Sequence, residues 1–174
     1  MIEFPQNTDS EMQGRRSGHV CRLESGGDTP MTGDANKALV RAFGEAGNRS
    51  DLEAFDRLLA PNFVRHCEAT PGVSVTSCED FKQFYRDTAA TFPDQKMDLQ
   101  TLVAEGDRVA FWAKFSGTQQ GPMGPFPPTG KCMESDCAGI FRIEDGRIAE
   151  LWVTWDNLAG LAQLGLFPPP TPVA

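Results

Sequence analysis

Apolar residues recur at intervals of three and four along the first part of the chain, and this spacing predicts helices. One helix follows Asp34, the expected N-cap, and covers residues 34–47. A second, short helix starts at Asp51 and ends at Pro61, and a short strand over residues 62–67 comes after it. The globular part of the chain therefore begins with helical segments.

A third predicted helix opens at Ser77 and has the clearest periodicity. Its apolar face repeats at i, i+3, i+4, i+7 and i+11 and consists of Phe81, Phe84, Tyr85, Thr88 and Phe92. Pro93 then breaks the helix. The helix is thus amphipathic, with one face that has to be covered by the rest of the protein.

Beyond this helix the apolar period changes to two, which predicts strands. Residues 97–103 alternate in polarity, and the chain turns at Gly106 before a strand over residues 109–115. A Gly/Pro-rich loop over residues 121–130 precedes two further strands. Asp145-Gly146 joins them with a strong hairpin signal, because a type I′ turn requires positive φ at both central positions.

Helices followed by an antiparallel sheet indicate the α+β class. A compact solution is a strongly curved sheet, a cone that holds the three N-terminal helices in its concave side and leaves a pocket at its wide mouth. A short C-terminal helix over residues 157–164 completes it, with Gly165 as a suitable C′ residue. Residues 34–168 are expected to form this single domain.

The two ends of the chain differ from the domain. Residues 1–33 are rich in Gly, Ser and charged side chains without apolar periodicity, which predicts a disordered N-terminal extension. Met31 stands at its end, so the true translation start is either Met1 or Met31. Residues 169–174 form a Pro-rich tail.

The chain of 174 residues carries a formal net charge of −8, which argues against nucleic acid and anionic membranes as partners. No apolar run is long enough to cross a bilayer, and the N-terminus lacks the apolar core of a secretory signal. The five cysteines include no C-x-x-C pair, which suggests neither a disulfide framework nor a zinc site. A cytoplasmic location is the natural expectation.

Few residues of the chain are candidates for catalysis or metal binding. The chain has two histidines, His19 in the predicted extension and His66, so no histidine cluster for a metal is expected, and neither metal nor cofactor is predicted. Trp155-Asp156 stands where the last strand becomes a helix. A carboxylate among tryptophans narrows the options to proton transfer by a carboxylate or to no chemistry.

Several short segments resemble the SnoaL-like polyketide cyclases of the NTF2-like superfamily. They are Asp51-Leu52-Glu53-Ala54, Leu58-Leu59-Ala60-Pro61, Phe63-Val64-Arg65-His66, the stretches 103–109, 128–131 and 141–148, Glu150-Leu151-Trp152, and Trp155-Asp156. Their order and spacing cover about residues 34–166. The resemblance implies the NTF2-like cone and a homodimer that pairs through its sheet.

The resemblance also implies a mechanism. In these cyclases an aspartate late in the chain serves as acid and base in an intramolecular aldol closure without metal or cofactor, and Asp156 matches it here. The alternative is that Asp156 only caps the final helix. His66 either orients or polarises a substrate carbonyl, or is an inert residue at the pocket rim.

Further candidates for binding the substrate are aromatic or acidic. Trp152 and Asp136 lie on mixed faces of the last two strands, which form either a pocket wall or a surface that faces solvent or a second subunit. Trp112 is expected to be buried lining. Phe126 in the Gly/Pro-rich loop points either into the pocket or into a crossover or subunit contact.

The leading hypothesis is therefore a cofactor-free enzyme that moves protons on a small, hydrophobic, carbonyl-containing molecule, in an aldol ring closure or a related isomerisation. Two alternatives remain open on the same fold. One is a non-catalytic module for ligand binding or dimerisation. The other is an epoxide or ester hydrolase in which Asp156 activates water.

Overall fold

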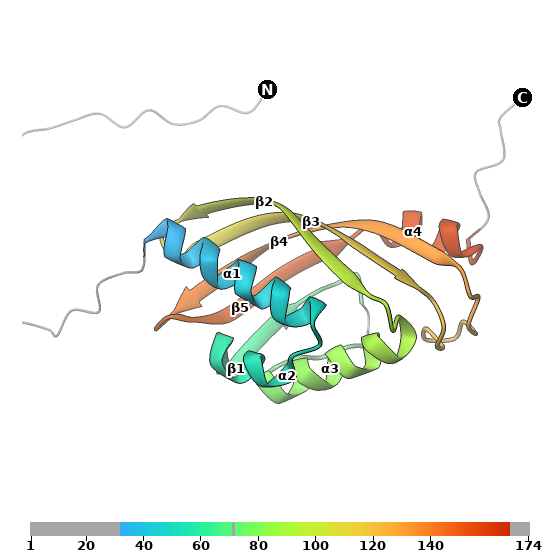
Figure 1. The fold of residues 1–174 in the computed structure, drawn as a ribbon, viewed down its shortest axis with the longest axis horizontal. Coiled ribbons are helices and arrows are strands. Elements are labelled where there is room, and N and C mark those ends of the chain that lie inside the picture. The colour runs from blue at the N-terminus through green and yellow to red at the C-terminus, as the bar shows by residue number, and fades with distance from the viewer. Residues whose placement is uncertain (1–31, 71, 168–174) are drawn as a thin grey trace, which may run out of the picture.

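The computed structural model describes residues 32–70 and 72–167, and the predicted extension and tail lie almost wholly outside them (Figure 1). The elements follow the order α1 (Gly33–Asn48), α2 (Leu52–Leu58), β1 (Leu59–His66), α3 (Cys78–Thr91), β2 (Lys96–Glu105), β3 (Arg108–Thr118), β4 (Cys132–Glu144), β5 (Arg147–Trp155) and α4 (Asn157–Leu164). This confirms the α+β class, with helices before and after the long strands. No helix in the described ranges is long and apolar enough to cross a membrane.

The five strands form one sheet in the order β1-β5-β4-β3-β2. The four long strands are antiparallel neighbours, as predicted, but β1 pairs with β5 in parallel, with Arg65 opposite Leu151. The sheet is therefore mixed rather than purely antiparallel. Asp145 and Gly146 have φ values of 50° and 72°, which confirms the predicted hairpin between β4 and β5.

The helix ends agree with the sequence except in two places. Asp51 and Ser77 cap α2 and α3 as expected. The N-cap of α1, however, is Thr32, whose hydroxyl accepts a hydrogen bond from Ala35 N, and Asp34 lies inside the first turn. Pro61 does not end α2, because the helix stops at Leu58 and Pro61 lies within β1. An edge strand tolerates proline because its outer edge needs no N–H donor.

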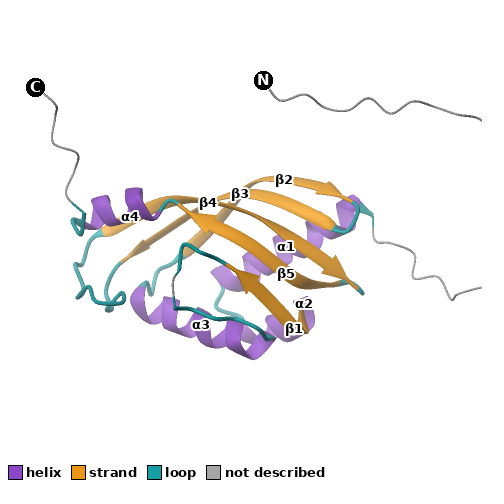
Figure 2. Ribbon diagram, turned by 180° about the vertical axis from the view of Figure 1, so that it is seen from behind, coloured by secondary structure: helices purple, strands orange, loops and turns teal. Residues whose placement is uncertain are grey.

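Three helices cover one face of the curved sheet, and the other face is open along its long strands (Figure 2). Strand alternation decides which side chains meet the helices. In β3, Val109, Phe111, Ala113 and Phe115 are buried, whereas Trp112 is 47% exposed on the opposite face. We call the side toward the helices the concave face and the opposite side the convex face.

Aromatic side chains from different elements form much of the core. Phe55 of α2, 1% exposed, meets the ring of Phe81 edge-on at 5.1 Å between centroids and lies 5.4 Å from Phe43. Phe43 in turn meets Phe141 of β4 at 5.4 Å. These ring pairs join all three N-terminal helix segments to the concave face, so they fix the distance between the helices and the sheet.

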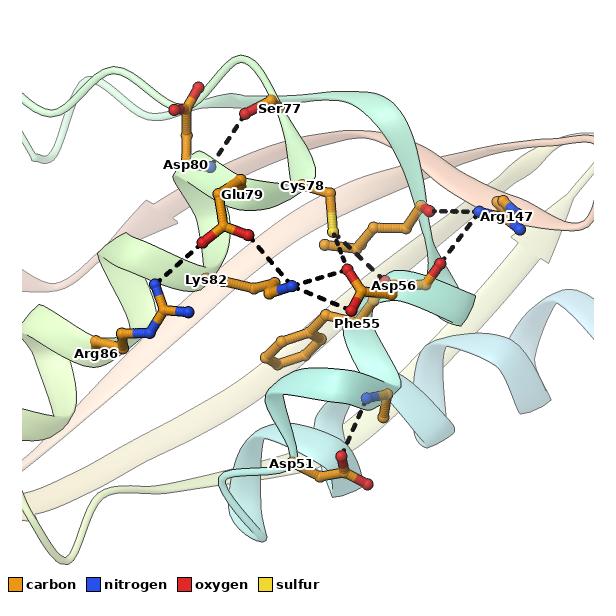
Figure 3. A network of polar contacts seen from close by, with 12 residues as sticks. Asp51, Phe55, Asp56, Ser77, Cys78, Glu79, Asp80, Lys82, Arg86 and Arg147 are labelled. Carbon is orange, nitrogen blue, oxygen red and sulfur yellow. Dashed lines mark hydrogen bonds and ion pairs between the residues drawn. The ribbon is translucent and has the colours of Figure 1, made fainter.

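A polar network holds the outer ends of α2 and α3 together (Figure 3). Lys82 Nζ of α3 lies 2.8 Å from Asp56 Oδ1 of α2 and 3.2 Å from Glu79 Oε2. Arg147 Nη1 at the start of β5 donates to the Asp56 carbonyl at 3.1 Å and to the Leu59 carbonyl at 3.4 Å. The network ties both helices to the sheet at the end of the molecule away from α4.

Candidate active site

A cavity of about 870 Å³ lies between the helices and the concave face of the sheet. This volume is within the range of small-molecule sites, and most of its wall is apolar. Its aromatic wall consists of Phe43, Phe55, Phe81, Phe84, Tyr85, Phe92, Phe111, Phe115, Phe141 and Trp155. Rings supplied by both the helices and the strands suit a flat, apolar ligand.

Arg65 is the charged residue most deeply set in this wall. It projects from β1 to the concave side, is 7% exposed, and its guanidinium carbon lies 4.5 Å from the centre of the Phe84 ring. Nη1 donates to Thr70 Oγ1 at 3.0 Å, but the buried Nη2 has no partner within the described chain. Burial lowers the pKa of Arg65 from its ordinary value, and the neighbouring Cys67 acts in the opposite direction. Arginine nevertheless keeps its charge in proteins.

A second buried donor lies further along the cavity. Trp155 Nε1 is buried and has no hydrogen-bond partner in the described residues, and its ring meets Phe115 edge-on. Since Arg65 is in register with Leu151, Trp155 lies four residues further along β5, roughly 13 Å at the usual strand rise. The lining residues Arg65 and Trp155 thus supply unpartnered donors at two separated places, and Gln95 Nε2 is a third such donor in the described residues.

Cys137 also lines the cavity, but it is not an activated nucleophile. Burial raises its pKa to about 12, with the nearby Asp136 as a smaller cause. The thiol is therefore protonated near neutral pH, and nucleophilic chemistry requires the thiolate. Its contact with Met97 Sδ at 3.5 Å agrees with a packing role.

The Gly/Pro-rich loop contributes three residues to the lining of the cavity. Gln119 anchors it: the side chain is fully buried, accepts from Thr129 Oγ1 at 2.7 Å and donates to the Pro127 carbonyl at 3.2 Å. Pro122, Met123 and Gly124 line the cavity. Phe126, the predicted inward residue, is half-buried and is not part of the lining; its backbone pairs with that of Met123.

Asp156 is exposed at the junction of β5 and α4. Its Oδ1 accepts from Ala159 N at 3.0 Å, which makes it the N-cap of α4. Its neighbours Trp155 and Asn157 line the cavity, but Asp156 does not. The geometry therefore supports the capping alternative, and a role in proton transfer stays a prediction.

His66 lies on the convex face, away from the cavity. Its ring stacks on Trp152 with 4.9 Å between centroids, and Nε2 donates to Glu150 Oε2 at 3.0 Å. Arg142 Nε donates to the other Glu150 oxygen at 2.7 Å. These two contacts, that of His66 first, lower the pKa of Glu150. His66 and Asp156 are thus not brought together in one site.

Three predicted lining residues lie on the convex face instead of in the cavity wall. Trp112 is 47% exposed, Trp152 carries the His66 stack, and Asp136 follows the parity of the exposed Ile140. Their place in the pocket is therefore corrected. The alternate residues of β5, Leu151 and Val153, occupy the concave side, because wholly apolar side chains gain most from burial there. The convex residues remain available for the predicted homodimer.

Sequence reasoning passed over Arg65 and Gln119. Gln119 gave no signal, since a single amide beside a Gly/Pro-rich loop is common. Arg65 did give one, because it shares strand parity with the apolar Phe63 and so had to face the core. No group of three or more His, Cys, Asp or Glu side chains within residues 32–70 and 72–167 is arranged to hold a metal.

The capping contact of Asp156 can be measured through two substitutions. Asp156→Ala removes the oxygen that accepts from Ala159 N, so we expect a loss of about 1 kcal/mol in the free energy of unfolding. Asp156→Asn keeps an acceptor, and its free energy should stay within about 0.5 kcal/mol of the original. Urea denaturation measures both. An Asn variant as unstable as the Ala variant would contradict the capping role.

Comparison with known families gives a match over most of the domain. The model of the family described as SnoaL-like polyketide cyclase matches residues 37–164. No curated protein sequence matches the chain.

Solved structures share this fold. IdmH from Streptomyces antibioticus, a proposed polyketide cyclase, is 33% identical with a TM-score of 0.66, over 75% of this chain and 98% of that chain. AclR from Streptomyces galilaeus, a proposed hydroxylase, is 27% identical with a TM-score of 0.71, over 81% and 91%. An epoxide hydrolase from M. tuberculosis, 15% identical with a TM-score of 0.61 over 75% and 90%, shows the shared fold alone. The NTF2-like architecture is thus confirmed.

Proposed function

The chain belongs to the family of SnoaL-like polyketide cyclases, and from this premise we propose that it is a small-molecule enzyme that promotes ring closure or isomerisation of a flat, carbonyl-containing compound. The observation that carries the proposal is the aromatic cavity of about 870 Å³ on the concave face. No cofactor is part of the proposal. The similarity to IdmH, a proposed cyclase, supports this reaction class.

The cavity contributes in two ways. Its rings hold a flexible chain in a folded conformation, so that two carbons of one molecule meet, and this proximity lowers the entropic part of the barrier. Arg65 Nη2 and Trp155 Nε1 have no partner within the described chain, and both residues line the largely apolar cavity. Such donors stabilise the negative charge that develops on a carbonyl oxygen as it becomes an enolate.

The acid/base role of Asp156 is a separate part of the proposal. A general base has to come within hydrogen-bond reach of the proton that it removes. Asp156 stands at the cavity end between two lining residues, with Oδ1 on the α4 cap. If it carries proton transfer, Asp156→Asn lowers turnover roughly a hundredfold with little change in stability. Turnover within a few-fold of the original protein would leave Asp156 as a cap alone.

Two alternatives use the same cavity. A binding module would return its ligand unchanged, whereas the proposed enzyme gives a cyclised or isomerised product of unchanged mass. A hydrolase would instead add the elements of water and incorporate solvent oxygen. Mass spectrometry of the ligand after incubation in ¹⁸O-labelled water distinguishes a hydrolase from the other two, and chromatography separates isomer from starting compound.

The place of binding is tested with a matched pair of bulky substitutions on β5. Val153→Trp adds an indole inside the cavity, whereas Thr154→Trp adds the same group to the exposed convex face one residue later. We expect Val153→Trp to weaken binding of 2-acetylnaphthalene, a neutral flat ketone, by about tenfold or more. Thr154→Trp should leave the Kd within about twofold. Isothermal titration calorimetry measures it, and equal affinities in both variants would refute the cavity as the site.

A further inference from the structure

We propose that the cavity selects ligands that carry an ionised oxygen, and that Arg65 binds it through its free Nη2 group. The proposal rests on the function proposed above and names the class of its ligand: a flat, apolar molecule with a carboxylate at one end. A carboxylate is the expected form because the planar guanidinium binds two acidic oxygens side by side.

The first support is the unbalanced charge of Arg65. Only 7% of the surface of Arg65 is exposed, and no carboxylate of the described chain pairs with it. Buried arginines are ordinarily paired, because removing a cation from water is costly. The contacts that it does have, with Thr70 Oγ1, the Phe84 ring and the neighbouring Cys67, orient the guanidinium and include no carboxylate. An anionic ligand would supply the missing charge.

The second support is that both carboxylates that line the cavity have other partners. Asp87 Oδ1 accepts from Gln83 Nε2 at 2.8 Å. Asp80 also lines the cavity, but its Oδ2 accepts from both Thr76 N and Thr76 Oγ1, each at 3.0 Å. These hydrogen bonds, with that from the Thr76 backbone first, lower its pKa. Asp80 is thus engaged in the turn before α3 and is not the counter-ion of Arg65.

The third support is the placement of two of the three unpartnered donors that belong to lining residues, those of Arg65 and Trp155; the third is Gln95 Nε2. Arg65 and Trp155 lie about four strand residues apart, roughly 13 Å along the cavity. Aromatic rings line the space between them, so a ligand of two or three fused rings could place an anionic oxygen at Arg65 and a neutral acceptor toward Trp155. The charged end then sets the orientation of the ligand, because the indole N–H carries no formal charge.

The test uses two probes of nearly equal shape, 2-naphthoate and 2-naphthamide, at pH 7. Binding of the amide measures the affinity of the apolar cavity alone. Binding of the acid measures the affinity of the cavity together with the charge of Arg65. We expect calorimetry to give a Kd at least about tenfold lower for the acid, since hydrogen bonds to charged groups are the stronger ones. Arg65→Gln should remove that preference, so that the Kd values of acid and amide for this variant lie within about twofold of each other.

Each outcome decides a different point. Equal affinities of the original protein for acid and amide would overturn the anion site and leave the cavity proposal standing, and this comparison needs no variant. Failure of both probes to bind at millimolar concentration would overturn the cavity proposal and the anion site together. Arg65→Lys keeps the charge without the planar fork, so it should retain part of the preference. If Arg65→Gln, shown to be folded by its thermal transition, kept the full preference, Arg65 would not be the binding group.

Discussion

Replacing Phe55 with Ala is expected to lower the free energy of unfolding by about 3–5 kcal/mol. Phe55 is 1% exposed and its ring meets those of Phe43, Phe81 and Tyr85, from two other helices. Truncation removes these contacts and enlarges a cavity that already exists beside it. Since small domains are stable by only about 5–15 kcal/mol, this single change removes a large part of the total.

Urea denaturation tests this expectation, with Phe167→Ala as the matched control. Phe167 is 44% exposed, so the same substitution there should change the free energy by less than about 0.5 kcal/mol. A loss of under 1 kcal/mol for Phe55→Ala would show that the aromatic cluster is not what joins the helices to the sheet. The same variant also tests function, because an enlarged, softer cavity should bind a flat ligand less tightly.

Much of the fold was predictable because it depends on local periodicity. The apolar face of α3 and the alternating strand β3 each follow from the sequence within one element. In β2 the predicted alternation holds only as far as Leu99, because the register shifts between Leu99 and Thr101 and leaves Val103 62% exposed. The hairpin at Asp145-Gly146 was predictable for a different reason, since two positive φ values require particular residues. The parallel pairing of β1 with β5 was not, because it joins segments about 85 residues apart and no local pattern records it.

The candidate site was less predictable because two faces of one strand compete for the interior. Aromatic Trp152 suggested a pocket wall, but the opposite side of β5 is wholly apolar at Leu151 and Val153 and occupies the concave face. Strand parity was right, and the choice of face was wrong. The final strand thus shows why an aromatic residue by itself is weak evidence for a binding pocket.

For Arg65, strand parity predicted that the side chain is buried, but no neighbouring residue in the sequence indicated what the buried charge binds. The residue follows Phe63 by two positions in β1, so its side chain had to enter the cone. Whether a buried cation is paired depends on residues from other elements, here Thr70 and Phe84. A functional interpretation therefore required the three-dimensional surroundings.

The second large effect is expected at Gly139, where Ala should cost about 3 kcal/mol or more. Gly139 lies in β4 between Phe111 and Val153 of the neighbouring strands. A Cβ there would lie 2.1 Å from the Trp152 carbonyl oxygen and 2.7 Å from Phe111 Cε1. Because the first of these atoms is backbone, β4 and β5 would have to separate, and no side-chain rotation relieves the contact.

Gly117→Ala is the control, since it places the same methyl group in β3 with Phe92 Cβ as its nearest neighbour, at 3.1 Å. Phe92 Cβ moves only with its backbone, but a shift of a few tenths of an ångström at the end of α3 relieves the contact without separating paired strands, so this variant should lose no more than about 1 kcal/mol. Alanine lowers the conformational entropy of the unfolded chain, which stabilises each variant by about 0.4–1 kcal/mol. This contribution is the same in both variants, so it drops out when their free energies of unfolding are subtracted. Urea midpoints give that difference. Equal stability of the two variants would mean that β4 and β5 can move apart freely, and the wall that holds the cavity would then be softer than its packing indicates.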